Sequence, residues 1–204
     1  MHKPYAESCI ENRAPIFAVL EQRLKNCTSM LEIGSGTGQH AVYFAADLPR
    51  LVWQTSYMAA THAGNVAWLD EAALPNVRRP LSLDVVADDW PPGLFDAVFS
   101  ANTAHIMPAS AVEAMFHGVG GVLRPGGQFL LYGPFNYAGR FTAPSNERFE
   151  GWLKERDPLM GIRDVVWLRE LAAAADMALA EDIEMPVNNR MLVWRKASQI
   201  AADG

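Results

Sequence analysis

Short apolar runs alternate with amphipathic stretches along most of the chain. Apolar runs bounded by glycine, proline or polar residues are typical of buried strands, whereas apolar residues three and four positions apart are typical of helices. The pattern predicts strands at residues 29–33, 51–56, 80–83, 95–101 and 128–132. It predicts helices at residues 11–26, with Pro15 in the first turn, and at 39–47, 61–73 and 109–123. Pro125-Gly126-Gly127 is expected to end the last of these helices.

The C-terminal part of the chain departs from this alternation. Residues 133–163 are rich in glycine, proline, asparagine and arginine, with one helix expected at 146–156. Asp164 can cap a helix that runs to about residue 175. Two closing strands, at 177–184 and 191–195, have no helix between them, so one strand near the C-terminus is expected to run antiparallel.

Strands that alternate with helices imply βαβ units and a parallel sheet. We therefore predict an α/β fold: a single-domain, Rossmann-like, doubly wound sheet of about seven strands, mostly parallel, with one antiparallel strand near the C-terminus. The domain is expected to span residues 1–204, with an N-terminal helical segment at 1–27 and an insert at 133–163 that closes over the cleft.

Composition and charge narrow the class of protein. Of 204 residues, 50% are hydrophobic and 20% are charged, which excludes an intrinsically disordered chain. The net charge of −6 disfavours a nucleic-acid partner. No apolar run approaches the roughly 20 residues that span a bilayer, the first residues lack the apolar segment of a secretion signal, and two cysteines do not form a disulfide framework. We expect a cytoplasmic protein with a small-molecule substrate and no nucleic-acid or membrane partner; the sequence leaves the oligomeric state open.

The strongest chemical signal is a glycine-rich turn after the first predicted strand. Glu32 precedes Gly34, Gly36 and Gly38, and a predicted helix follows. Glycine allows positive φ and close approach of a ligand, and a helix start offers N–H groups to an anionic group. A dinucleotide fingerprint would need a small residue where Gln39 stands, and the Gly-Lys-Ser/Thr of a P-loop is absent. A tight structural turn without a ligand stays an alternative.

This turn resembles motif I of class I S-adenosylmethionine-dependent methyltransferases. Leu83-Asp84-Val85 resembles the segment in which that superfamily places an acid near the adenine amino group. Phe95 to Asn102 resembles its fourth-strand motif, and Val122 to Leu130 resembles its turn into strand five. The resemblance implies S-adenosylmethionine as cofactor and S-adenosylhomocysteine as product. The implied cofactor-binding residues are Glu32, Gly34, Ser35, Gly36, Gly38, Tyr57, Asp84, Val85 and Asn102.

Motifs in the second half narrow the match. Tyr132-Gly133-Pro134-Phe135, Pro144-Ser145-Asn146 and Met185-Pro186-Val187-Asn188-Asn189-Arg190 resemble the methyltransferase-like protein 26 family, also called domain of unknown function 938. The resemblance covers roughly residues 5–196. It implies a class I fold and S-adenosylmethionine binding, and implies little about the substrate.

One position departs from the family pattern. The second strand of the family usually ends in Trp-Gln-Pro-Ser-Asp, and in class I enzymes an acid there holds both ribose hydroxyls. Here Tyr57 stands in place of the acid, and no Asp or Glu occurs from residue 51 to 69. Loss of a hydrogen bond to a charged group would weaken cofactor binding by about 10- to 100-fold. Three interpretations stay open: Gln54, Ser56 or the Tyr57 hydroxyl binds the ribose; the pocket serves another ligand; or catalysis has been lost.

The candidate substrate side lies after the fourth and fifth predicted strands. His105 is the candidate catalytic residue, as a base or a substrate-orienting group; its alternative is packing under a loop. Arg163 is a candidate fork for a substrate carboxylate, with a salt bridge to Asp157 or Asp164 as the alternative. Asn12 and Arg13 could reach the methionine carboxylate or simply cap and solvate their helix. The full set of substrate candidates is Tyr132, Tyr137, Asn146, Arg163, Asn188 and Asn189.

The sequence therefore predicts an enzyme that transfers a methyl group from S-adenosylmethionine to oxygen or nitrogen of a small molecule. Two alternatives stay open: an S-adenosylmethionine-dependent enzyme that cyclises or eliminates, and a non-catalytic binding protein on the same scaffold. No metal-binding motif and no hydrolase elbow occurs in the sequence.

Overall fold

The computed structural model describes residues 3–58 and 62–198, without the side chains of 62–65. Six helices are described: α1 (Glu7–Arg23), α2 (Gln39–Asp47), α3 (His62–Ala72), α4 (Ala109–Val122), α5 (Pro144–Arg156) and α6 (Val165–Ala174). The main sheet is formed by β1 (Ser29–Glu32), β2 (Val52–Tyr57), β3 (Val77–Ser82), β4 (Phe95–Ala101), β5 (Leu123–Gly133), β8 (Met177–Met185) and β9 (Asn189–Lys196). Two short strands, β6 (Phe135–Asn136) and β7 (Arg163–Asp164), pair with each other outside it.

The seven strands lie in the order β3-β2-β1-β4-β5-β9-β8. The pairs from β3 to β5 are parallel, and β9 runs antiparallel to both β5 and β8. The predicted α/β doubly wound sheet with one antiparallel strand is thereby confirmed. Because the order reverses between β1 and β4, their carboxyl ends border a crevice, which is where open α/β sheets bind ligands.

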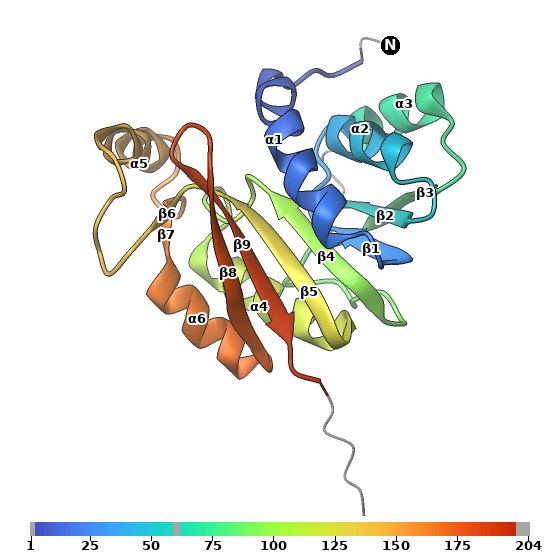
Figure 1. Cartoon of the computed structure of the whole chain (residues 1–204). Helices are drawn as coiled ribbons and strands as arrows, with labels where there is room; N and C mark the ends of the chain where they lie inside the picture. The colour runs from blue at the N-terminus through green and yellow to red at the C-terminus, as the bar shows by residue number, and fades with distance from the viewer. Residues whose placement is uncertain (1–2, 59–61, 199–204) are drawn as a thin grey trace, which may run out of the picture.

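Helices cover both faces of the sheet (Figure 1). On one face, Ile16 and Leu20 of α1 pack with Phe44 of α2 against β1 and β2. On the other face, Phe116 of α4 and Leu168 of α6 share a second core with β5 and β9. Figure 1 shows α5 and the tip of the β8–β9 hairpin at the same edge of the sheet as the N-terminal end of α1. No helix in the described part of the chain is both long and apolar enough to cross a bilayer.

Two local predictions were wrong. Helix α1 begins at Glu7, so Pro15 lies inside it and not in its first turn; contacts of the N-terminal turn with α2, described below, extend the helix. Helix α4 ends at Val122 and β5 begins at once, so the Pro125-Gly126-Gly127 segment lies in the strand and not at a helix end. The register between β4 and β5 shifts there, which fits a proline that cannot donate to the ladder.

Candidate functional site: a glycine turn beside a cavity

The glycine turn links β1 to α2 in left-handed backbone. Gly34, Gly36 and Gly38 have φ of 69°, 54° and 84°. A Cβ added to Gly34 would lie 2.8 Å from Cγ2 of Thr103, which follows β4. The backbone N–H of Ser35 donates to the Ser56 carbonyl at 2.9 Å, and the Ser56 N–H donates to Ser35 Oγ at 3.1 Å. The turn is therefore fixed between the ends of β2 and β4, as a ligand-binding turn at a switch point requires.

Glu32 supports this turn from the protein interior. Its side chain is 2% exposed, and its carboxylate accepts a hydrogen bond from Trp53 Nε1 at 2.9 Å. Burial raises the pKa of Glu32 to about 7, and the hydrogen bonds from Trp53 and Ser35 oppose that rise. The carboxyl group thus ties β1 to β2 beneath the turn.

Helix α1 covers the beginning of α2. The backbone N–H of Ala6 donates to Gln39 Oε1 at 2.6 Å, and Gln39 Nε2 donates to the Ala6 carbonyl at 3.4 Å. Asn12 Oδ1 lies 2.7 Å from His40 Nε2, and the guanidinium of Arg13 lies over the ring of Tyr43. Asn12 and Arg13, both candidates for the methionine carboxylate, therefore hold α1 on α2 in this structure.

The predicted ribose and adenine edge is formed by the ends of β2 and β3. Tyr57 ends β2, and its carbonyl accepts a hydrogen bond from the Leu83 N–H at 2.9 Å. Asp84 Oδ1 accepts from the Val86 N–H at 3.0 Å within its own turn, and Val85 is buried. Two of the three neutral candidates for binding the ribose form hydrogen bonds to the protein backbone instead. Gln54 Nε2 donates to the Arg79 carbonyl, and Ser56 Oγ donates to the Glu32 carbonyl. Residues 59–61, which follow Met58, lie outside the described residues.

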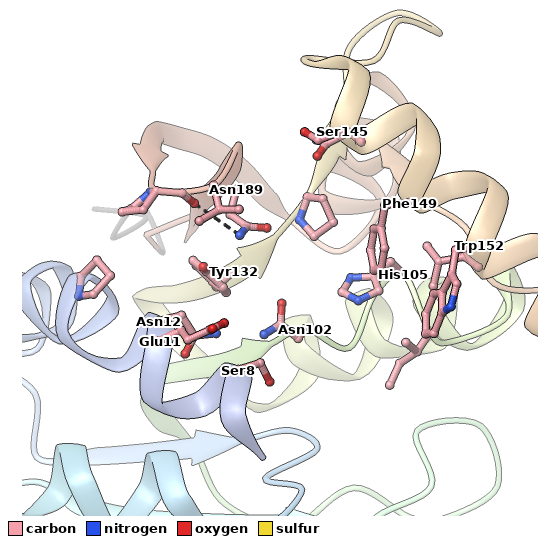
Figure 2. Close-up of a pocket in the computed structure, with 17 residues that line it drawn as sticks. Ser8, Glu11, Asn12, Asn102, His105, Tyr132, Ser145, Phe149, Trp152 and Asn189 are labelled. Carbon is pink, nitrogen blue, oxygen red and sulfur yellow. Dashed lines mark hydrogen bonds between the residues drawn. The ribbon is translucent and has the colours of Figure 1, made fainter.

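A cavity of about 630 Å³ opens beside the glycine turn, between α1, the ends of β4 and β5, α5 and the β8–β9 hairpin (Figure 2). Among the predicted site residues, Asn102, His105, Tyr132, Asn146 and Asn189 line it, whereas the glycines do not. Asn102 adopts a left-handed conformation with φ of 57°, and its neighbour Thr103 contacts Gly34. The complete lining is Ser8, Glu11, Asn12, Pro15, Asn102, His105, Ile106, Tyr132, Pro134, Ser145, Asn146, Phe149, Trp152, Leu153, Pro186, Val187 and Asn189.

His105 is the titratable base of this cavity. Its side chain is 7% exposed and packs edge-on against Phe149, with 5.4 Å between ring centroids. Burial, with a smaller contribution from the positive charge of Arg163, lowers the pKa of His105 to about 4. Among the described residues, no hydrogen bond joins either ring nitrogen to a partner. At neutral pH the imidazole is therefore uncharged and able to accept a hydrogen bond, while burial and the charge of Arg163 oppose its protonation.

Arg163 does not face the cavity, which corrects the prediction of a carboxylate-binding fork. Its Nε donates to the Ala104 carbonyl at 3.0 Å, and its Nη2 donates to the carbonyls of Met107 and Leu159. Neither Asp157 nor Asp164 pairs with it, so the alternative salt bridge was wrong as well. The guanidinium instead holds the loop that carries His105. Asp164 caps α6, as predicted, by accepting from the Val166 N–H.

Tyr137 and Asn188 also lie outside the cavity lining. The Tyr137 hydroxyl donates to Asp182 Oδ2 at 2.7 Å, and burial, together with this carboxylate, raises the pKa of Tyr137. Asn188 Nδ2 donates to Ser145 Oγ at 3.0 Å, and its carbonyl accepts from Asn146 Nδ2 at 3.3 Å. Asn188 therefore ties the hairpin tip to α5, and Tyr137 ties the segment after β6 to β8. Their positions do not support substrate roles. Tyr132 does line the cavity, and burial raises the pKa of its hydroxyl.

Sequence reasoning missed several lining residues, among them Phe149, Trp152 and Glu11. Phe149 and Trp152 stack on α5, with centroids 5.7 Å apart and an interplanar angle of 13°. Glu11 lies on the exposed side of α1 (Figure 2). The spacing of three between aromatic residues on an otherwise polar helix was the available signal for the first two. Nothing local in the sequence marked Glu11. Within the described part of the chain, no group of His, Cys, Asp and Glu residues is arranged to hold a metal.

The sequence profile of the family described as "Protein of unknown function (DUF938)" matches residues 3–196. Solved structures of methyltransferases are similar to this fold. An O-methyltransferase family protein from Burkholderia thailandensis has a TM-score of 0.80 at 15% identity, covering 92% of this chain and 57% of that one. Human N-acetylserotonin methyltransferase in complex with S-adenosylmethionine has a TM-score of 0.78 at 14% identity, covering 94% of this chain and 53% of that one.

The mitomycin 7-O-methyltransferase also matches, with a TM-score of 0.78 at 13% identity, covering 93% of this chain and 54% of that one. The chain thus spans between half and three fifths of the length of these proteins. At these identities the similarity shows a shared class I methyltransferase fold.

Proposed function

The chain belongs to the DUF938 family, and on that premise we propose that it binds S-adenosylmethionine and transfers its methyl group to oxygen or nitrogen of a small-molecule acceptor. The observation that carries the proposal is the glycine turn, fixed at the switch point of the sheet and joined through Thr103 to the cavity that holds His105. The acidic chain favours a cytoplasmic enzyme of one domain without a nucleic-acid or membrane partner. Residues 133–163, several of which line the cavity, close over the cleft in this proposal.

The glycine turn fits the methionine end of this cofactor. Open space lies beside Gly36, where an added Cβ would have only the Gly34 carbonyl within 4.0 Å. The turn also leads into the N-terminus of α2, which favours a carboxylate. The ribose end fits less well, because Tyr57 replaces the expected acid. We therefore propose weaker cofactor binding than in relatives that keep the acid.

When bound, S-adenosylmethionine would supply a methyl group on a sulfonium, which a nucleophile held in line can displace. The residues of this chain align the acceptor and exclude water from it. The uncharged imidazole of His105 accepts a hydrogen bond from the acceptor O–H or N–H, and it takes the proton as methyl transfer puts positive charge on that oxygen or nitrogen. Arg163 holds the His105 loop, so that the imidazole stays directed at the cavity.

The test is calorimetric titration of the native protein with S-adenosylmethionine and with S-adenosylhomocysteine, beside the variants Tyr57→Asp and Tyr57→Phe. We expect binding by the native protein and about 10- to 100-fold tighter binding by Tyr57→Asp. Tyr57→Phe removes only the hydroxyl and reports whether that group contacts the ribose. No binding by the native protein or by Tyr57→Asp would refute the cofactor assignment and favour a non-catalytic role.

Tyr57 also favours a second candidate, an enzyme that opens the sulfonium by cyclisation or elimination. Product analysis separates the two candidates. Methyl transfer yields S-adenosylhomocysteine, whereas the alternative yields methylthioadenosine or another fragment of the cofactor.

A further inference from the structure

The cavity beside His105 combines an aromatic end with an absence of positive charge. Its lining, within the described part of the chain, contains no lysine or arginine, and its one formal charge is the carboxylate of Glu11. Phe149, Trp152 and His105 bring three rings to one end, across the cavity from Glu11 (Figure 2). This distribution of groups restricts the chemical class of acceptor that the cavity can bind.

We infer that the acceptor is a flat aromatic molecule, neutral or cationic, that carries no carboxylate or phosphate group. The inference rests on the proposed function, because it takes the cavity to be the acceptor site. The aromatic end of the cavity favours a flat ring. The absence of lysine and arginine from the lining disfavours a ligand that carries a carboxylate or phosphate.

The aromatic end exposes apolar surface to solvent. Trp152 is 50% exposed and Ile106 is 48% exposed, and both border the cavity together with Pro134 and the buried Leu153. A planar ring placed against Phe149 and Trp152 would cover this apolar surface and gain the stacking geometry that aromatic pairs prefer. A polar aliphatic acceptor would leave the surface in water and gain neither contribution.

The arginines around the cavity are not available to an anion. Arg163 donates to three backbone carbonyls behind the His105 loop. Arg190 is paired with Asp182 and Glu184. Arg156 lies over the ring of Trp152 at 5.4 Å but does not line the cavity. A carboxylate inside the cavity would lose its hydration without gaining a cation, which is costly, and Glu11 would repel it.

The experiment compares three ligands that share a phenol ring and differ in charge: tyramine, tyrosol and 4-hydroxyphenylacetate. Their dissociation constants are measured by ligand-observed NMR titration on the full chain without S-adenosylmethionine. We expect tyramine and tyrosol to bind at least tenfold more tightly than 4-hydroxyphenylacetate. Equal affinities, tightest binding of the acid, or no binding by any of the three would overturn the inference.

Variants of three residues test whether the phenols bind inside the cavity. Glu11→Gln is expected to reduce the preference for tyramine over tyrosol about threefold and to leave tyrosol binding unchanged. Trp152→Ala is expected to weaken all three ligands by about tenfold. Arg156→Gln is the matched control on the same helix, and the order of the three ligands should persist in it. If Arg156→Gln abolishes binding of tyrosol, the ligands sit on the outer surface and the inference is wrong.

The outcome is separable from that of the cofactor titration. Selective binding of the phenols by a protein that does not bind S-adenosylmethionine would keep the ligand class and refute methyl transfer. Cofactor binding without selectivity among the phenols would refute the ligand class and keep the proposed function.

Discussion

The two sides of the crevice are built in different ways. On the cofactor side, a contiguous segment from β1 to α2 forms the turn mainly with backbone, and its three glycines adopt left-handed φ. On the acceptor side, side chains from α1, the ends of β4 and β5, α5 and the β8–β9 hairpin meet around a cavity. The cofactor side is therefore sensitive to a single added methyl group, whereas the acceptor side is sensitive to the placement of whole loops.

Two buried histidines show the same contrast. His40 and His105 are each 7% exposed, and burial lowers the pKa of each to about 4. On the cofactor side, His40 is bonded to Asn12 and stacks on Phe44. On the acceptor side, His105 lines the cavity with no hydrogen-bond partner for its ring in the described part of the chain. Equal burial thus leads to a packing role in one case and to a candidate base in the other.

The largest expected effect separates these two histidines. His105→Gln is expected to lower kcat for methyl transfer by about 10²- to 10⁴-fold, because it removes the proton acceptor. His40→Gln should lower the free energy of unfolding and reduce kcat at least tenfold less than His105→Gln does. Steady-state kinetics and thermal melts of both variants provide the measurement. Equal losses of kcat would contradict the contrast.

The second effect concerns the glycine turn. Gly34→Ala places a Cβ 2.8 Å from Thr103 Cγ2 at a φ of 69°, so cofactor affinity should fall by about tenfold or more, and stability by about 1–3 kcal/mol. Gly139→Ala is the matched control: its φ is 73°, but no atom lies within 4 Å of the added Cβ. It should lose similar conformational stability and keep its cofactor affinity. Calorimetric titration and denaturant melts of both variants test this, and a Gly34→Ala protein with unchanged affinity would show that the turn does not hold the cofactor.

A third effect is the pH dependence of stability through His105. The folded pKa of about 4 lies below the ordinary value of 6.5, so the unfolded chain takes up a proton that the folded chain does not. The contribution of His105 to the free energy of unfolding is constant above pH 6.5. It is lost as the pH falls from 6.5 towards 4, at about 1.4 kcal/mol per pH unit. The difference in unfolding free energy between the native protein and His105→Gln should therefore change across this window. Denaturant melts from pH 7 to 4.5 measure it, and a difference independent of pH would contradict the buried neutral state.

A smaller effect is expected at Arg163, which acts on His105 through the loop and through its charge. Arg163→Met should lower kcat by about tenfold, and should move the acidic limb of the pH profile of kcat upwards, since a positive charge that lowers the pKa of His105 is lost. Arg163→Lys keeps the charge but cannot reproduce the three carbonyl contacts, so it should lower stability and leave the limb in place. If the acidic limb of the pH profile shifts equally in Arg163→Met and Arg163→Lys, the shift comes from the geometry of the His105 loop and not from the charge of Arg163.

The smallest effect is expected at Asn188. The residue has a φ of 57° at the hairpin tip and bonds to Ser145 with its side chain. Asn188→Gly fits this backbone, so stability should change by less than about 0.5 kcal/mol. The KM for the acceptor should rise about twofold, because one link between the hairpin and α5 is lost. A large loss of kcat would instead restore Asn188 as a substrate residue.

Sequence reasoning succeeded where the signal was local. The period of apolar residues predicted β4 at 95–101 and α2 at 39–47 with the bounds that the structure has. It did not predict β6 and β7, since strands of two residues carry no period. Arg163 was assigned to the substrate because its loop was expected over the cleft; the direction of its side chain depends on the carbonyls of residues 104 and 107, about 60 positions away. The pairing of Phe149 with His105 across 44 positions was invisible for the same reason.

Local features of the sequence are sufficient to predict the class I fold and the glycine turn. Periodicity decides which residues face the core, and only glycine takes left-handed backbone at no steric cost. The tertiary structure decided which side chains face the acceptor cavity, that Arg163 serves the loop of His105, and that this imidazole is uncharged at neutral pH. These properties depend on burial and on contacts between distant segments, because desolvation and charge act through space and not along the chain.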